Sequence, residues 1–170
     1  YPLFGLDDGV YLQHSDHPGL MTKREVRIQL LADLNPPEHG VLWDLGAGTG
    51  RIGLEALRLR PELQLMAVEQ RAGGAALIKA NAERLGVCPA AVLEANAIDL
   101  LRGELPAEIP ADLQQPNRVV VGGGGRQRNT LLQLVLERLK PLGVVVVPLA
   151  TVESRSEVRR VLEDATLRAR

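Results

Sequence analysis

The sequence predicts an α/β domain built on a mostly parallel β-sheet with helices on both faces. Two observations carry this prediction: strand-like and helical segments alternate along the chain, and the strand-like segments are apolar on both faces. Strands buried on both faces are typical of parallel sheets, whose crossover connections place helices above and below them. The length of 170 residues suits a single compact domain.

The first 21 residues differ from the rest of the chain. Residues 1–21 are polar and broken by Gly and Pro, and we expect a solvated N-terminal arm there, carrying His14 and His17. A single domain is then expected over residues 22–170.

A helix is expected to begin at Thr22. Thr22 and Glu25 have the spacing of a capping box. One apolar helical face follows, formed by Val26, Leu30, Leu31 and Leu34.

Strands and helices then alternate to the C-terminal end. The expected strands are the short apolar runs 41–45, 65–68, 91–93, 119–121 and 143–147. The expected helices are 51–60, 72–85, 130–139 and 154–166. Three prolines make 103–117 a predicted surface loop. Trp43 is expected to pack in the core of the sheet.

Composition disfavours several classes of function. Lys and Arg total 20 against 21 Asp and Glu, so no global basic field favours a nucleic-acid partner. The single cysteine, Cys88, fits a reducing compartment, which predicts a cytoplasmic protein. No apolar run approaches the ~20 residues that span a bilayer. His and Cys show no metal-ligand spacing, so no metal site is expected.

The loop after the first expected strand carries the main functional signal, because ligands bind beyond the carboxyl ends of parallel strands. It reads Gly46-Ala47-Gly48-Thr49-Gly50 and lies just beyond Asp44. Its third glycine comes one position too early for the dinucleotide pattern, and no Gly-Lys-Ser/Thr ending forms a phosphate loop. An acid before G-x-G-x-G is instead the pattern of S-adenosylmethionine-binding folds. The alternative is a plain glycine turn.

Three further strand ends supply candidate cofactor contacts. Glu69 lies about 20 residues beyond the glycine loop, the spacing at which an acid binds ribose hydroxyls; otherwise it is a surface carboxylate. Asn96, followed by Ala97, can contact adenine, and this role is compatible with capping a helix. The run Gly122 to Gly125 removes side-chain bulk beside the reacting methyl, or forms a flexible loop.

Five segments together resemble a known family. They are Met21 to Arg27, Leu42 to Gly50, Gly122 to Gly125, Arg138 to Pro141 and Ala150 to Glu153, in the family's order. The family is that of the decarboxylating precorrin methyltransferases of cobalamin biosynthesis, which methylate C-15 of a corrin precursor and decarboxylate its ring C acetate. The sequence departs from the family's usual residues at Asn96, Asn117 and Pro148.

The resemblance implies more than the residues alone do. It implies a Rossmann-like class I methyltransferase fold, here without the last strands, and S-adenosylmethionine as methyl donor. Thr22, the loop Gly46 to Gly50, Glu69 and Ala97 match the family's cofactor contacts. The resemblance further implies a tetrapyrrole substrate, a homo-tetramer, and in many organisms fusion behind a second methyltransferase domain that acts at C-5.

A corrin precursor carries many carboxylates, so its site needs cationic partners. The candidates are Lys23, Arg51, Arg126 and Arg128, for which solvated surface charge is the alternative. Glu153 is the candidate acid near the substrate, or else it stabilises the start of the last helix. The sequence singles out no catalytic acid.

Two other functions stay open at this point. One is methyl transfer to RNA or protein, although the Asn/Asp-Pro-Pro-Tyr/Phe motif typical of base amino-group methylation is absent after the fourth strand. The other is a non-catalytic S-adenosylmethionine-binding module.

Overall fold

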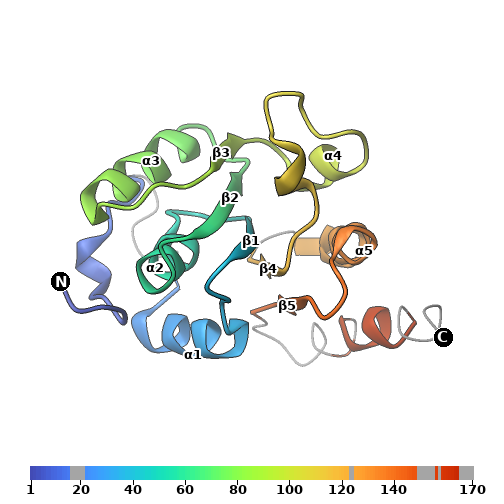
Figure 1. Ribbon diagram of the computed structural model, residues 1–170, viewed down its shortest axis with the longest axis horizontal. Coiled ribbons are helices and arrows are strands. Elements are labelled where there is room, and N and C mark those ends of the chain that lie inside the picture. The colour runs from blue at the N-terminus through green and yellow to red at the C-terminus, as the bar shows by residue number, and fades with distance from the viewer. Residues whose placement is uncertain (16–21, 123–124, 149–155, 157, 165–170) are drawn as a thin grey trace.

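Five parallel strands form one sheet in the order β3-β2-β1-β4-β5 (Figure 1). The computed structural model describes residues 1–15, 22–122, 125–148, 156 and 158–164. The strands are β1 (Gly40–Leu45), β2 (Leu63–Glu69), β3 (Ala91–Glu94), β4 (Arg118–Val121) and β5 (Val144–Val146). The predicted fold class is confirmed, and each expected strand is present to within a few residues.

Helices cover both faces of the sheet, as predicted. They are α1 (Arg24–Leu34), α2 (Arg51–Leu59), α3 (Gly74–Leu85), α4 (Ala97–Leu101) and α5 (Arg128–Arg138). Three short 3-10 turns accompany them, η1 (Asp8–Val10), η2 (Ala111–Gln114) and η3 (Gly125–Gln127). Figure 1 shows α1, α2 and α3 on one side of the sheet and α4 and α5 on the other. Of the expected last helix, residues 158–164 are helical.

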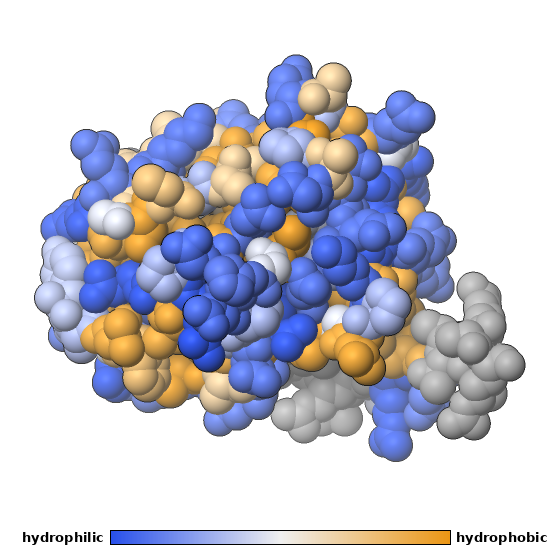
Figure 2. Space-filling model, in the orientation of Figure 1, coloured by the Kyte–Doolittle hydropathy of each residue, from blue (hydrophilic) through white to orange (hydrophobic). Residues whose placement is uncertain are grey.

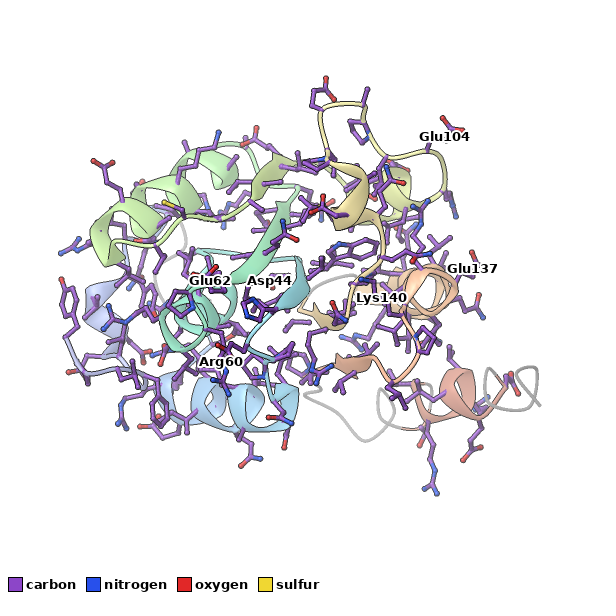
Figure 3. The ribbon with its side chains drawn as sticks, viewed as in Figure 1. Asp44, Arg60, Glu62, Glu104, Glu137 and Lys140 are labelled. Atoms are coloured by element: carbon purple, nitrogen blue, oxygen red, sulfur yellow. The ribbon has the colours of Figure 1, made fainter. Side chains whose placement is uncertain are left out.

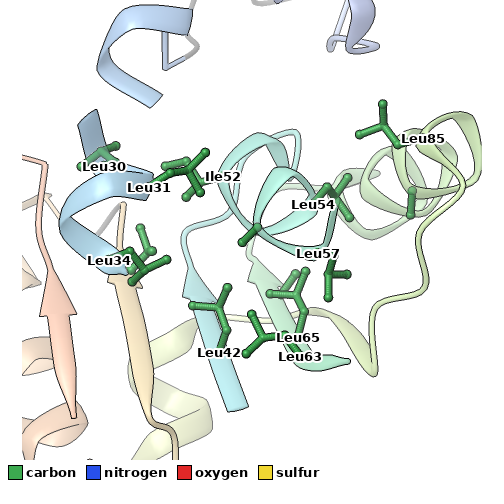
Figure 4. Close-up of a cluster of buried hydrophobic side chains, with 14 of the residues drawn as sticks. Leu30, Leu31, Leu34, Leu42, Ile52, Leu54, Leu57, Leu63, Leu65 and Leu85 are labelled. Carbon is green, nitrogen blue, oxygen red and sulfur yellow. The ribbon is translucent and has the colours of Figure 1, made fainter. Parts of the chain in front are cut away.

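The two faces of the sheet bury separate cores. Leucines of α1 and α2 meet Leu42 of β1 and Leu65 of β2 on the first face (Figure 4). On the second face, Trp43 and Val119 pack with residues of α4 and α5. Trp43 is fully buried, as expected, and its indole Nε1 donates a hydrogen bond of 2.8 Å to the carbonyl of Leu113. Alternate residues of one strand therefore serve opposite cores.

The strand order reverses at β1, which places the ligand edge of the sheet. β1 pairs with β2 on one side and with β4 on the other, both in parallel. The chain passes from β1 to β2 and β3 on one side of β1 and then returns to β4 on its other side. At such a switch point a crevice opens beyond the carboxyl ends of β1 and β4. The glycine loop and Gly122 follow those two strand ends.

The segment 103–117 is largely the exposed loop that its prolines predict, with the 3-10 turn η2 near its end, but it also supplies buried side chains. Leu105, Ile109 and Leu113 are buried in the second core, and Leu113 is fully enclosed beside Trp43. Their spacing of four residues was the available signal, since it sets three large aliphatic side chains at regular intervals along this proline-containing segment. The segment acts as a cover for the sheet where no long helix lies.

The expected start of α1 is also wrong. The helix begins at Arg24, its cap position is Lys23, and no side chain caps it, so Thr22 and Glu25 form no capping box. Val26 is 49% exposed, whereas Arg27 is completely buried with the three leucines of the helix. Arg27 occupies the apolar face because buried partners compensate its charge, as described below.

The described part of the N-terminal arm is packed against the domain rather than solvated. Leu6 and Tyr11 are buried and belong to the first core. Figure 2 shows apolar surface in the region where Figure 1 places the N-terminal segment and α1. Within the N-terminal segment, Tyr1, Leu3 and Phe4 are exposed. The division of the chain at residue 21 stays a prediction, and His17 lies outside the described residues.

Within the described ranges, no helix has both the length and the apolar character needed to cross a bilayer. The same part of the chain contains no cluster of three or more His, Cys, Asp or Glu able to hold a metal ion.

Candidate active site

Two adjoining cavities lie beyond the carboxyl ends of the strands. The larger, of about 420 Å³, is lined by residues that follow β2, β3 and β4, among them Glu69, Asn96 and Ala97. The smaller, of about 140 Å³, is lined by the glycine loop, Asp44, Thr22 and Arg51 among others. Gly46 and Gly122 line both cavities, so the two cavities adjoin at these glycines. A third cavity of about 380 Å³, between the N-terminal segment, α2 and the end of α3, lies away from the strand ends.

The glycine loop turns sharply from β1 into α2. Gly46, Gly48 and Gly50 all have positive φ, at 72°, 58° and 86°, a conformation that side chains with Cβ rarely adopt. A Cβ on Gly48 would meet nothing within 4 Å, so the loop backbone is open to a ligand there. Gly50 lines neither cavity; a Cβ there would press on Leu54 and Ile78, which makes it a packing residue.

Gly122 allows β4 to approach the glycine loop closely. Its N–H donates to the carbonyl of Leu45 at 2.8 Å, and an added Cβ would lie 3.1 Å from the carbonyl oxygen of Gly46. Any side chain at this position would push against the backbone between the two cavities. The close approach of β4 to the glycine loop therefore depends on glycine here. Gly123 and Gly124 of the predicted run lie outside the described residues.

Glu69 ends β2 with its carboxylate beside the glycine loop. Its Oε1 accepts a hydrogen bond from the N–H of Gly48 at 3.3 Å, and its Oε2 one from the N–H of Arg71 at 3.5 Å. Both bonds are long, and the side chain is only half-buried and lines the larger cavity. A carboxylate held in this way keeps acceptor capacity for vicinal hydroxyls, as a ribose contact requires.

Asn96 caps α4, which confirms the helix-cap interpretation. Its Oδ1 accepts from the N–H groups of Ile98 and Asp99 at 3.0 and 3.1 Å, and its Nδ2 donates to Gln70 Oε1 at 3.0 Å. An amide oxygen has two lone pairs, and both are used. The unused capacity of Asn96 is a second Nδ2 hydrogen, which suits a ring nitrogen of adenine better than its amino group.

Asp44 is a buried carboxylate at the wall of the smaller cavity and was not among the expected contacts. Its Oδ2 accepts from the N–H of Gly53 at 3.2 Å, and the side chain lies near the centre of the fold (Figure 3). Burial raises the pKa of Asp44 to about 7; the hydrogen bond from Gly53 opposes the shift and the charge of Glu69 adds to it. No described cationic side chain forms an ion pair with Asp44. A bound cation would supply that missing charge.

The expected substrate cations fall into two groups. Arg51 is 3% exposed and donates to the Asp8 carboxylate at 2.9 Å and to the Asp8 carbonyl at 2.9 Å, so it is not a free surface charge. Lys23 and Arg126 are exposed, and Arg128 is half-buried at the start of α5. Glu153 lies outside the described residues. The structure therefore leaves Lys23, Arg126 and Arg128 available to a ligand beyond the strand ends.

Sequence reasoning missed the charged residues that join the N-terminal segment to this site. Arg27 and Glu55 are both completely buried and paired, with Arg27 Nε 2.6 Å from Glu55 Oε2. The signal was the position of Arg27 on the apolar face of α1, three residues before Leu30. Charges are normally exposed unless paired, and here the partners lie 28 residues apart in the chain.

Comparison with known proteins decides the family. The family model described as "Precorrin methyltransferase domain" matches residues 13–166. The chain belongs to this family. It is 34% identical over 155 residues to a probable cobalt-precorrin-6B C(15)-methyltransferase (decarboxylating) of Pyrobaculum calidifontis, covering 91% of this chain and 74% of the relative.

Two further comparisons place this precorrin methyltransferase domain. It is 36% identical over 149 residues to a precorrin-6Y C(5,15)-methyltransferase [decarboxylating] of a Sinorhizobium species, covering 88% of this chain but only 33% of that longer protein. A crystal structure of precorrin-6y C5,15-methyltransferase from Geobacter metallireducens aligns with a TM-score of 0.79 and 30% identity, covering 97% of this chain and 80% of that one. The expected enzyme class and methyl donor, S-adenosylmethionine, are confirmed at the level of family and fold.

Proposed function

We propose that this precorrin methyltransferase domain transfers a methyl group from S-adenosylmethionine to C-15 of a corrin precursor and promotes decarboxylation of the ring C acetate. The observation that carries the proposal is the similarity to a relative named for C-15 methylation, of which the chain spans 74%. The strand-end cavities support it, because the candidate cofactor contacts line two adjoining cavities at one edge of the sheet. In the longer Sinorhizobium relative, the chain spans a third of the protein.

We infer that the donor lies across both cavities. Glu69 then accepts from the ribose hydroxyls, with Asn96 and Ala97 beside the adenine in the larger cavity. The methionine end lies along the glycine loop and Thr22 in the smaller cavity, where Asp44 faces its cationic groups. A buried carboxylate without a cation is costly, and a positively charged ligand removes that cost.

The donor supplies a methyl group bonded to a positively charged sulfur, so the leaving group is already activated. The main work of the protein is to position the two reactants, which can contribute several kcal/mol. Gly122 allows β4 to lie close to the glycine loop at the point where both cavities are lined. In the decarboxylation, the carbon–carbon bond between the acetate methylene and its carboxylate breaks and carbon dioxide leaves. The electron pair of that bond enters the ring system, and a proton is then taken up from water.

Cations beyond the strand ends are proposed to hold the substrate carboxylates. Lys23 and Arg126 are exposed, and Arg128 is half-buried. Arginine binds carboxylates in a bidentate manner, which suits a substrate that carries several acetates and propionates. Arg51 is not proposed as a direct substrate contact, because Asp8 already engages it. Glu153 stays a candidate near the substrate.

We further propose that the domain forms a homo-tetramer and works in the cytoplasm. We also propose that a C-5 methyltransferase domain is fused to it or acts beside it. The length of the Sinorhizobium relative supports the last point, since its name includes both the C-5 and the C-15 position.

Mass spectrometry of the reaction product tests the function. Incubation with S-adenosylmethionine and the C-5-methylated precursor should give a product that has gained one methyl group and lost one carbon dioxide. A product with the methyl group alone would show that the decarboxylation assignment is wrong. Transfer to RNA or protein with no change in the precursor would show that the acceptor is wrong.

A further inference from the structure

A cluster of charges joins the N-terminal segment to the wall of the smaller cavity; its arginines and Glu55 are buried, whereas the Asp8 side chain is 39% exposed. Asp8 Oδ1 accepts from Arg27 Nη1 at 3.0 Å and from Arg51 Nη1 at 2.9 Å. The ring of Tyr11 lies against both guanidinium groups, 5.1 Å from Arg27 and 4.8 Å from Arg51. We call Asp8, Arg27, Arg51 and Glu55 the N-terminal charge cluster. Two guanidinium groups thus share one carboxylate oxygen.

This cluster touches the donor site directly. The carbonyl of Thr22 accepts from Arg27 Nη1 at 3.0 Å and from Arg51 Nη1 at 3.4 Å. Thr22 and Arg51 themselves line the smaller cavity. Arg51 is 97% buried and its Nε has no hydrogen-bond partner in the described structure. Arg51 therefore places a buried positive charge next to the smaller cavity, beside Thr22.

The charges of the cluster balance only with Asp8 included. Glu55 is saturated by Arg27, by Tyr11 OH and by the N–H groups of Gly5 and Leu6. Among the described residues, Asp8 is the carboxylate that forms an ion pair with Arg51. Burial alone would raise the pKa of Asp8, but the hydrogen bond from Arg27 and the charges of both arginines lower it below its ordinary value. Asp8 is thus anionic at neutral pH.

The methyl donor and its product differ by one charge. S-adenosylmethionine carries a sulfonium, whereas S-adenosylhomocysteine carries a neutral thioether of nearly the same shape. An uncompensated guanidinium in the cavity wall would repel the sulfonium, and repulsion between like charges is stronger where water is excluded. The neutral product would escape most of this repulsion.

We propose that Asp8 is a specificity-determining positioning residue, which neutralises Arg51 so that the site prefers the cationic donor over the neutral product. The inference rests on the proposed donor placement. On this proposal, residues 5–12 influence donor binding through Arg51 and do not contact the ligand themselves. The link from Leu12 through Asn81 to the carbonyl of Thr49 holds the same segment to the glycine loop.

Calorimetric titration of Asp8→Asn with S-adenosylmethionine and with S-adenosylhomocysteine, at low salt and pH 8, tests this role. We expect the affinity for the donor to fall at least threefold more than the affinity for the product. Asp7→Asn is the matched control, since it removes the same charge from the exposed neighbouring residue, and it should leave both affinities unchanged. Added salt should shrink the difference seen in Asp8→Asn.

Equal weakening of both ligands by Asp8→Asn would overturn the proposal, because a purely structural role predicts that result. No weakening of either would overturn it too. If Asp8→Asn does not fold, Arg51→Met gives a second test: removing the guanidinium should shift the preference toward the donor, and an unchanged or reversed preference refutes the proposal. Failure of the wild type to bind either ligand would instead count against the proposed function.

Discussion

Replacing Asp44 by Asn should stabilise the unliganded protein at alkaline pH. The carboxylate is buried and has no cationic partner among the described residues, and its pKa rises from 3.8 to about 7. At about 1.4 kcal/mol per pKa unit, the ionised form costs the fold roughly 4 kcal/mol above pH 7. The Asn side chain introduces a buried amide N–H without a partner, which destabilises the variant by about 1–3 kcal/mol. The net expected gain at pH 8 is therefore about 1–3 kcal/mol.

The pH dependence of this gain is the sharper part of the prediction. Because the folded state holds the Asp44 proton more tightly than the unfolded state, its contribution to stability falls as pH rises from about 4 to 7. The advantage of Asp44→Asn should accordingly be about 2–3 kcal/mol larger at pH 8 than at pH 5. Urea unfolding at both pH values measures it, with the exposed Asp33→Asn as control. An equal difference in free energy of unfolding at the two pH values would refute the reasoning.

The same variant separates stability from function. If Asp44 faces the cationic end of the donor, Asp44→Asn should bind S-adenosylmethionine at least tenfold more weakly, the scale of a lost hydrogen bond to a charged group, ~1.5–3 kcal/mol. A more stable protein with a weaker donor site would show that the chain keeps a destabilising carboxylate for binding.

Local geometry also predicts the effects of substitutions at two other positions. Leu142 is 98% exposed and has a φ of 63°, so Leu142→Gly should raise the free energy of unfolding by about 0.5–1 kcal/mol in urea titration, and a loss of stability would contradict this. Asn96→Ala removes the α4 cap and should lower that free energy by about 1 kcal/mol, while Asn96→Asp, which keeps the acceptor, should not. If Asn96→Ala leaves S-adenosylhomocysteine affinity unchanged, the proposed adenine contact is wrong.

The fold could be predicted because its signals are local. Each strand is a short apolar run, the helices between the strands show their own periodicity, and Gly86 ends α3 in the expected left-handed conformation. The candidate site followed from the same pattern, since parallel strands bring their carboxyl ends to one edge. Glu69, Asn96 and the glycine loop therefore meet around the cavities although they are distant in sequence.

The remaining features depend on pairing between distant residues. Sequence patterns assigned Arg27 and Glu55 no role of their own, and they offered Arg51 as a substrate-binding cation. The burial of these three side chains depends on the N-terminal segment, which supplies Asp8 and Tyr11 as partners. No local sequence pattern predicts a charge partner that lies so far away in the chain. The pKa of Asp44 is likewise a property of the assembled core rather than of the loop sequence.

The central claim is that the strand-end cavities hold S-adenosylmethionine, with Glu69 on its ribose. Calorimetric titration of the wild type and of Glu69→Ala with S-adenosylhomocysteine tests it most directly. The account predicts one binding site in the wild type and affinity weaker by ~1.5–3 kcal/mol in Glu69→Ala. No binding to the wild type at millimolar ligand, or equal affinity in the two proteins, would contradict it.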